Sequence, residues 1–561
     1  MLLAARSAAA LHRLLDVLPV FSGDDRIARC FTLVPGSEFG LDALAALERV
    51  GARTIPWQEA CRRPYDVILA ASPKGELKRL RGPRVLLPHG AGFSKTLPGE
   101  GSGDSASGLD PAYLLPGGGP LAACHALAHP RQIAQLAALS PGAATRAAAV
   151  GDPTLERLLD SRSHRAAYRE ALGTGARKLI VLTSTWGRES LLHRRPDLPA
   201  GLAAGLPQDA YQLALVLHPN EHSRLGAFDL SQQLAPAFDA GLVLAEPYEG
   251  WAALLVAADA VITDHGSTAL YAAALNRPVI AAYDGGEELI PGSPMAELLS
   301  HSPRLAPFDT PGRCLAADVE AALHAQHPYA LRDIAGSAFA GRGQALERLR
   351  QRLYHLLGLT PRAAPVLPRP LPAPAPPPRS PAAFAVRAHL DRTGSPQVRI
   401  ERFPAYGGPP TAPAHFLAAE HGTASERHAQ SAGLLYRRTP LLPAARHHVA
   451  WTAGGWTAHA LAAYPQCRGA AMVVSASLCV VRARSGPLLS VRIAPCREDG
   501  RLVYAEPAAV LCAVHAWLLR RDAAPHAAPA PLPAAITALI GPYAYTVRIE
   551  AATEAEADRT G

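Results

Sequence analysis

The stretch that most constrains the fold runs from residue 258 to 283, with the sequence ADAVITDHGSTALYAAALNRPVIAAY. Val261 to Thr263 is a short apolar run, Asp264 to Thr268 is a polar turn, Ala269 to Leu275 is a helix of small and apolar residues, and Pro278 to Tyr283 is a second apolar run. A helix between two short buried strands is the crossover unit of a parallel sheet, so this stretch predicts α/β architecture.

The polar turn in this stretch predicts a ligand site. A strand that turns directly into a helix leaves free N–H groups at the turn, which suit an anion and most often a phosphate. Gly266 allows close backbone approach, while Ser267 and Thr268 can cap the helix and donate hydroxyls. The alternative is an ordinary crossover with a well-capped helix.

Two βα series precede a proline-rich segment. Strands are expected in the first series at 26–34, 54–55, 66–70 and 85–87, and in the second at 178–183, 211–217, 242–244, 261–263 and 279–283. Helices are expected at 41–51, 121–140 and 340–357, and the apolar spacing of 1–20 predicts an amphipathic helix. Each series predicts a doubly wound parallel sheet.

Ten prolines between Thr360 and Pro381 predict a semi-rigid extended linker. After it, strand-like runs at 383–390, 398–403, 472–483, 488–493 and 543–549 and a helix at 507–521 predict a small α+β domain. We therefore divide the chain into a Rossmann-like acceptor-side domain (1–160), a Rossmann-like nucleotide-donor domain (161–358), the linker (359–382) and an α+β domain of unknown role (383–561).

Composition excludes several classes of protein. Among the 561 residues, 49% are hydrophobic and 18% charged, which is typical of a globular protein. The net charge is +8, but Lys and Arg are scattered, so no nucleic-acid partner is expected. None of the 8 cysteines lies in a CxxC or Cys/His spacing, so no metal site is expected, and a reducing cytosol fits. We predict a cytoplasmic protein, with peripheral attachment to the inner membrane face as an alternative.

Polar residues gather where the predicted strands end. His89 and Lys95 follow the last strand named in the first series, while Ser184 and Thr185, then His218, then Asp264 to Thr268 follow strands of the second. In two consecutive doubly wound domains these strand ends face one cleft. A nucleoside diphosphate suits such a cleft, and a histidine opposite can deprotonate a hydroxyl.

These motifs resemble a known family. The pattern is similar to GT-B glycosyltransferases and, more narrowly, to the CDP-glycerol glycerophosphotransferases of teichoic-acid synthesis in the cell envelope. The residues that carry the resemblance are Pro88-His89-Gly90 with Lys95, Val150-Gly151-Asp152-Pro153, Val181 to Trp186, Leu217-His218-Pro219-Asn220, Thr263-Asp264 with Ser267, and Asn276-Arg277-Pro278-Val279. The turn at 264–267 also resembles that of UDP-N-acetylglucosamine 2-epimerases.

The resemblance implies roles for individual residues. His89 is expected to be the general base, and His218 is the second residue assigned to catalysis. The residues expected to bind the nucleotide-activated donor, CDP- or UDP-linked, are Lys95, Ser184, Thr185, Asp264, His265, Gly266, Ser267 and Thr268. No cofactor other than this donor substrate is expected.

The predicted function is transfer of a glycerophosphate or glycosyl group from the donor to a hydroxyl acceptor, which could be membrane-linked. Two alternatives stay open: an epimerase or hydrolase of the nucleotide sugar, and a non-catalytic GT-B-fold protein that binds a nucleotide or a partner. The family has an aspartate near Tyr271 and a basic residue shortly before His218, and this chain has neither, which favours the non-catalytic alternative. The sequence does not indicate the oligomeric state.

Overall fold

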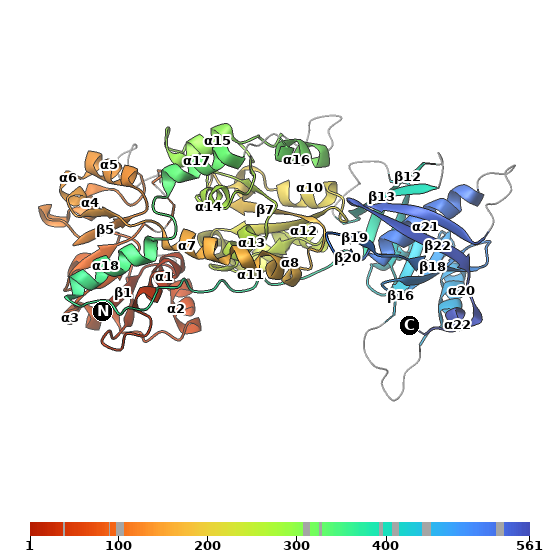
Figure 1. Cartoon of the computed structure of the whole chain (residues 1–561), viewed down its shortest axis with the longest axis horizontal. Helices are drawn as coiled ribbons and strands as arrows, with labels where there is room; N and C mark the ends of the chain where they lie inside the picture. The colour runs from red at the N-terminus through yellow and green to blue at the C-terminus, as the bar shows by residue number, and fades with distance from the viewer. Residues whose placement is uncertain are drawn as a thin grey trace.

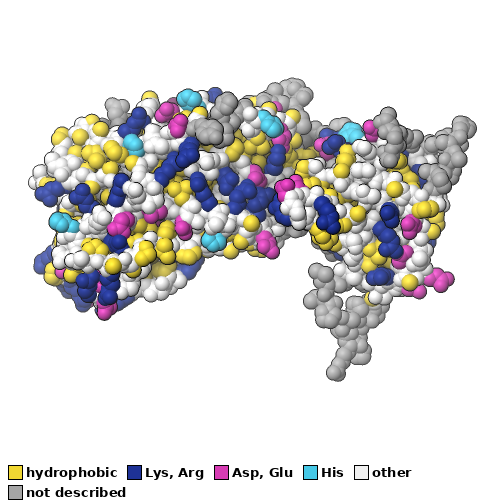
Figure 2. All heavy atoms as spheres, in the orientation of Figure 1, with side chains coloured by type: hydrophobic (Ala, Val, Ile, Leu, Met, Phe, Trp, Pro, Cys, Tyr) yellow, Lys and Arg dark blue, Asp and Glu magenta, His cyan; other side chains and the backbone are white. Residues whose placement is uncertain are grey.

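The computed structural model describes residues 1–36, 40–88, 90–91, 93–96, 106–306, 315–324, 328–391, 396–406, 414–439, 450–522 and 532–560. Figure 1 shows three parts in a row: two α/β units, each built on one sheet, and a barrel at the C-terminal end. Within the described ranges, no helix is long and apolar enough to cross a membrane. On the face in Figure 2, Lys and Arg side chains lie over all three parts, among apolar and uncharged atoms.

The first unit is built on a six-stranded parallel sheet of order β2-β1-β3-β4-β5-β6. Its strands are β1 (Leu2–Ala5), β2 (Cys30–Leu33), β3 (Ile68–Ala70), β4 (Arg84–Leu86), β5 (Cys124–Leu127) and β6 (Ala147–Ala149). Its main helices are α1 (Ala8–Leu15), α2 (Gly40–Arg49), α3 (Trp57–Arg62) and α5 (Pro130–Leu139), and α7 (Pro153–Asp160) follows β6. Two hydrophobic clusters cover the two faces of this sheet.

The second unit has a five-stranded parallel sheet of order β11-β10-β7-β8-β9. Its strands are β7 (Lys178–Ser184), β8 (Tyr211–Leu217), β9 (Val243–Leu244), β10 (Ala260–Thr263) and β11 (Val279–Ala281). Its helices include α8 (Arg165–Ala171), α10 (Leu198–Gly205), α11 (Pro219–Gln233), α13 (Gly250–Ala257), α14 (Thr268–Ala274), α15 (Pro294–His301), α16 (Leu315–His324) and α17 (Pro328–Ala338). The strands are apolar along their length because both faces are buried.

The last helix of the second series returns to the first unit. In α18 (Ala345–Leu357), Leu346, Leu349 and Leu353 are buried in the cluster that contains α1. Figure 1 shows this green helix among the red and orange elements of the first unit. The proline-rich segment then runs past the second unit to the barrel without regular secondary structure.

The C-terminal part is a closed nine-stranded barrel that encloses a helix. Its strands are β12 (Ala383–Asp391), β13 (Gln397–Pro404), β14 (Phe416–Glu420), β15 (Leu434–Arg438), β16 (Gly469–Ser475), β17 (Leu478–Ala483), β18 (Leu488–Ile493), β21 (Ala534–Ile540) and β22 (Tyr543–Ala551). Residues 508–514 of α21 (Pro507–Asp522) are fully buried with the inward side chains of these strands. A helix that is apolar all round requires burial on every side, which the barrel provides.

The structure confirms mixed α/β architecture with parallel sheets and corrects three sequence predictions. Residues 1–20 are not one helix, because Leu2–Ala5 forms β1, which pairs on both sides in the first sheet. The predicted helix at 121–140 contains a strand, Cys124–Leu127. The C-terminal part has helices and strands as expected, but its sheet closes into a barrel, which alternation alone did not indicate.

A buried ion pair attaches the barrel to the second unit. Arg402 of β13 donates to both carboxylate oxygens of Asp209, at 2.8 and 2.6 Å, and the two side chains are only 4% and 7% exposed. The backbone repeats the contact, since the N–H of Gln208 donates to the carbonyl oxygen of Arg402 at 2.8 Å. Because both charges are buried, removal of either one leaves the other without a partner and lowers the stability of the fold.

We therefore expect Asp209→Ala to lower the free energy of unfolding by about 3 kcal/mol or more, because it leaves a buried guanidinium unpaired. The control is Glu401→Ala, which removes the half-buried partner of Arg387 from the strand that carries Arg402, β13, and should cost less than about 1 kcal/mol. Calorimetric melting of the full chain measures both. Equal losses of stability in the two variants would contradict a special role for the Arg402 pair.

Candidate functional site

A cavity of about 250 Å³ lies between the two α/β units. On one side it is lined by residues that follow β1 and β4 of the first sheet, and on the other by residues that follow β7, β8 and β10 of the second. The carboxyl ends of both sheets therefore face it, as the two βα series predicted.

The order in which the chain adds strands to the second sheet reverses at this cavity. The chain proceeds from β7 to β8 and β9 on one side, then returns to place β10 and β11 on the other side of β7. The loops after β7 and β10 therefore diverge, which opens a crevice between adjacent strand ends. The hydroxyls of Thr183 and Thr263 meet across these strands at 2.7 Å, directly below the crevice.

The structure brings the predicted site residues to this one cavity. Those that line it are Lys95, Ser184, Thr185, His218, Asp264, His265, Gly266, Ser267 and Thr268. His89 lies outside the described residues, and its neighbours Pro88 and Gly90 line the cavity. A Cβ atom added to Gly90 would lie 3.1 Å from the hydroxyl of Ser267, so the two units approach closely here.

Asp264 braces the crevice. Its carboxylate is fully buried and accepts the backbone N–H groups of Thr185, Leu191 and Gly266 at 2.7, 2.9 and 2.8 Å. Burial raises the pKa of this carboxyl, while nearby His265 and the three N–H groups oppose the rise. These bonds tie together the loop after β7, the start of the short helix α9 (Leu191–Arg194) and the turn before α14, so Asp264 shapes the site.

His265 is held between two partners and its side chain is fully buried. Its Nε2 lies 3.1 Å from Glu288 Oε2 and its Nδ1 lies 3.1 Å from the hydroxyl of Tyr283. Tyr283 donates its own proton to the carbonyl oxygen of Glu189. Burial alone would raise the pKa of Glu288, but the hydrogen bond from His265 and the charge of Lys95 lower it.

Lys95 crosses from the first unit to the second. Its Nζ is 3.4 Å from the hydroxyl of Thr185, 3.9 Å from Glu288 Oε2 and 5.8 Å from the centre of the Trp186 ring. The backbone around it pairs with the second unit: Thr96 N–H donates to the carbonyl oxygen of Glu288 and Ile290 N–H donates to that of Ser94, each at 2.9 Å. This pairing holds the ammonium group at the cavity wall.

His218 caps α11 at the end of β8. Its Nδ1 accepts the N–H of Asn220 at 3.1 Å, which places the proton of the neutral ring on Nε2. The ring is therefore a hydrogen-bond donor on the side away from the cap. The helix α14, in contrast, has only seven residues, so the anion site predicted at its start depends on side chains more than on a helix dipole.

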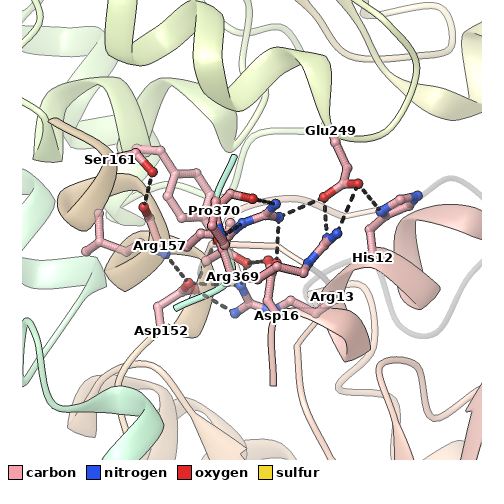
Figure 3. Close-up of polar contacts among 12 residues, drawn as sticks. His12, Arg13, Asp16, Asp152, Arg157, Ser161, Glu249, Arg369 and Pro370 are labelled. Carbon is pink, nitrogen blue, oxygen red and sulfur yellow. Dashed lines mark hydrogen bonds and ion pairs between the residues drawn. The ribbon is translucent and has the colours of Figure 1, made fainter. Parts of the chain in front are cut away.

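Sequence reasoning missed a buried ionic cluster beside the cavity, drawn in Figure 3. Arg13 forms a bidentate pair with Asp152 at 2.9 and 2.6 Å and also donates to the carbonyl oxygen of Pro88 at 3.0 Å, directly before His89. Tyr271 donates to Asp152 at 3.1 Å. Asp152 lies in a motif that carries the resemblance, but Arg13 and Tyr271 come from distant parts of the sequence, so the sequence alone does not show that the three meet.

No protein-family model matches the chain, and no curated protein matches it. Similar solved structures include a variant of the wall teichoic acid polymerase TagF, with a TM-score of 0.45 and 13% identity over 64% of this chain and 88% of that one. A second is the UDP-GlcNAc 2-epimerase from Neisseria meningitidis bound to UDP-GlcNAc, with a TM-score of 0.40 and 11% identity over 63% and 99%. A third is HepE of Anabaena in complex with UDP, with a TM-score of 0.37 and 17% identity over 64% and 99%.

These structures include both kinds of enzyme that the sequence motifs resemble: TagF is a CDP-glycerol glycerophosphotransferase, and the others include a UDP-GlcNAc 2-epimerase. Because these TM-scores lie below 0.5, we base the function on the geometry of the cavity and not on these likenesses.

The structural role of Asp264 can be tested by measuring the free energy of unfolding. We expect Asp264→Asn to lower the free energy of unfolding by about 2 kcal/mol, because an amide cannot accept all three buried N–H groups. Asp284→Asn is the control, since Asp284 is exposed and accepts one long bond of 3.4 Å from Gly286. Urea titration compares the two variants, and an unchanged stability of Asp264→Asn would contradict the brace.

Proposed function

We propose that the protein is a transferase that binds a nucleotide-activated donor in the cavity between the two α/β units and transfers a glycerophosphate or glycosyl group to a hydroxyl acceptor. The observation that supports this most is the juxtaposition in one cavity of the β7/β10 crevice and the turn that follows β4. The first offers hydroxyls and the second precedes Lys95, so a diphosphate would find donors from both units.

The donor's phosphates would lie between Lys95 on one side and Thr185, Ser267 and Thr268 on the other, with Nε2–H of His218 as a further donor. Ser184 contributes through shape, because its hydroxyl already bonds to Thr185 O at 3.1 Å and accepts Leu192 N–H at 3.3 Å. In this proposal Asp264 and His265 position the loops around the donor. Closure of the two units around the donor excludes water and aligns the acceptor.

His89 would act as the general base. It accepts the proton of the acceptor hydroxyl while that oxygen attacks the donor, either at the phosphorus that carries glycerol or at the anomeric carbon of a sugar. The bond to the nucleotide then breaks and its electron pair leaves with CMP or with the nucleoside diphosphate. Arg13, which donates to the carbonyl oxygen of Pro88, positions the peptide that leads into His89.

The test is His89→Asn in the full chain, with CDP-glycerol or UDP-N-acetylglucosamine as donor and glycerol as acceptor. We expect nucleotide release to fall about 100-fold or more, because general base catalysis contributes that much, while nucleotide affinity stays unchanged. The control is His355→Asn, an exposed histidine of α18 outside the cavity. Chromatography of the released nucleotide measures the rates.

Two outcomes would contradict the proposal. Release that does not depend on glycerol would indicate an epimerase or hydrolase. Absence of release from the unaltered protein with either donor would favour the non-catalytic alternative.

A further inference from the structure

His12 of α1 lies where two cavities adjoin. Beside the first cavity is a second of about 1010 Å³, lined by α1, α2, residues 243–254 and the proline-rich segment at 367–375. His12, Ala245, Glu246 and Glu249 line both cavities. A substrate part that entered the first cavity from the second would therefore pass His12.

The imidazole of His12 has hydrogen-bonding capacity that the described residues leave unused. Both ring nitrogens are buried, and neither has a hydrogen-bond partner in the part of the chain that the structure describes. An unsatisfied buried polar group destabilises a fold by about 1–3 kcal/mol, so its presence at a cavity wall indicates a ligand that completes it.

The surroundings of His12 fix its orientation. Its ring stacks on Tyr248, with ring centres 5.3 Å apart and planes inclined by 9°. Tyr248 adopts a φ of 76°, a left-handed conformation that is costly for a bulky residue and that clusters at functional sites. Nδ1 lies 3.7 Å from Glu249 Oε2. Figure 3 marks this contact with a dashed line.

Glu249 is itself held in place. Arg157 donates to it at 2.8 Å and Arg369 of the proline-rich segment also donates to it. Burial alone would raise the pKa of Glu249, but the charges of the two arginines lower it, so it faces His12 as a carboxylate. A carboxylate favours the tautomer of His12 that carries its proton on Nδ1, which leaves Nε2 as an acceptor.

The pKa of His12 lies below the ordinary value of an imidazole, which favours the neutral ring. Burial lowers its pKa, the carboxylates of Glu249 and Asp16 raise it, and the guanidinium groups of Arg369 and Arg157 lower it again. Arg157 and Arg369 already pair with the carboxylates of Asp16 and Glu249. An acceptor nitrogen at this place suits a group that donates a hydrogen bond. A hydroxyl on a polyol or a sugar is such a group, and the rings of Tyr248 and Trp251 line the same cavity.

We propose that His12, oriented by Glu249, binds a hydroxyl of the acceptor, and that the acceptor is a polyol or sugar that enters from the larger cavity. This inference rests on the proposed function, and it assigns His12 to acceptor recognition while His89 takes the reacting proton. The donor then lies near Lys95 and the acceptor near Glu249, and both residues line the first cavity.

The test uses the full chain with histidines labelled at Cε1 and observed by NMR, with glycerol and propan-1-ol as probes. The His12 resonance is the one absent from His12→Phe, which keeps the ring stack on Tyr248, and His12→Gln provides the same assignment if His12→Phe does not fold. We expect glycerol to shift this resonance at concentrations where propan-1-ol does not. The resonance of exposed His355 is the control and should respond to neither probe.

A second readout is kinetic. With either donor, His12→Phe should raise the KM for glycerol about 3- to 10-fold, the effect of one lost hydrogen bond, with little change in nucleotide affinity. Equal shifts of the His12 resonance with both alcohols, or no shift, would overturn the inference. Absence of nucleotide binding to the unaltered protein would instead overturn the proposed function. The two failures are distinguishable, because the NMR experiment with alcohols needs no nucleotide.

Discussion

The arrangement of the cavity depends on one buried guanidinium, that of Arg157 on α7. It donates to Asp16 of α1 at 2.9 Å, to Glu249 at the start of α13 at 2.8 Å, and to the carbonyl oxygens of Arg369 and Pro370 at 2.7 Å each. The first unit, the second unit and the proline-rich segment therefore meet at one side chain. A charge buried to this extent is tolerated only when its hydrogen-bonding capacity is satisfied, so the three segments are coupled.

This coupling explains why the proline-rich segment is more than a spacer. Prolines keep it extended without internal hydrogen bonds, so its carbonyl groups are available to Arg157. Its Leu371 is buried in the core of the second unit, and Arg379 pairs with Asp239 near its end. The segment thus closes one side of the larger cavity before it reaches the barrel.

The sequence predicted the parts of the molecule that depend on local pattern. Continuous apolar runs such as Lys178–Ser184 and Tyr211–Leu217 became central strands, and polar residues after them, including His218 and Asp264, met at one cavity. The sequence pattern was misleading where tertiary contacts decide the secondary structure. The apolar residues of Leu2–Ala5 suit a buried helix as well as a buried strand. They form β1 because they pair with β2 on one side and β3 on the other. His12, Arg157 and Glu249 come from distant segments, so only the folded chain shows that they belong together.

Calorimetric titration of the full chain with CDP, UDP, GDP and ADP tests the central claim, that the cavity binds a nucleotide, most directly. We expect micromolar binding of CDP or UDP, which His218→Ala should weaken and which His301→Ala, at an exposed position of α15, should leave unchanged. Failure of all four nucleotides to bind would show that the cavity is not a nucleotide site.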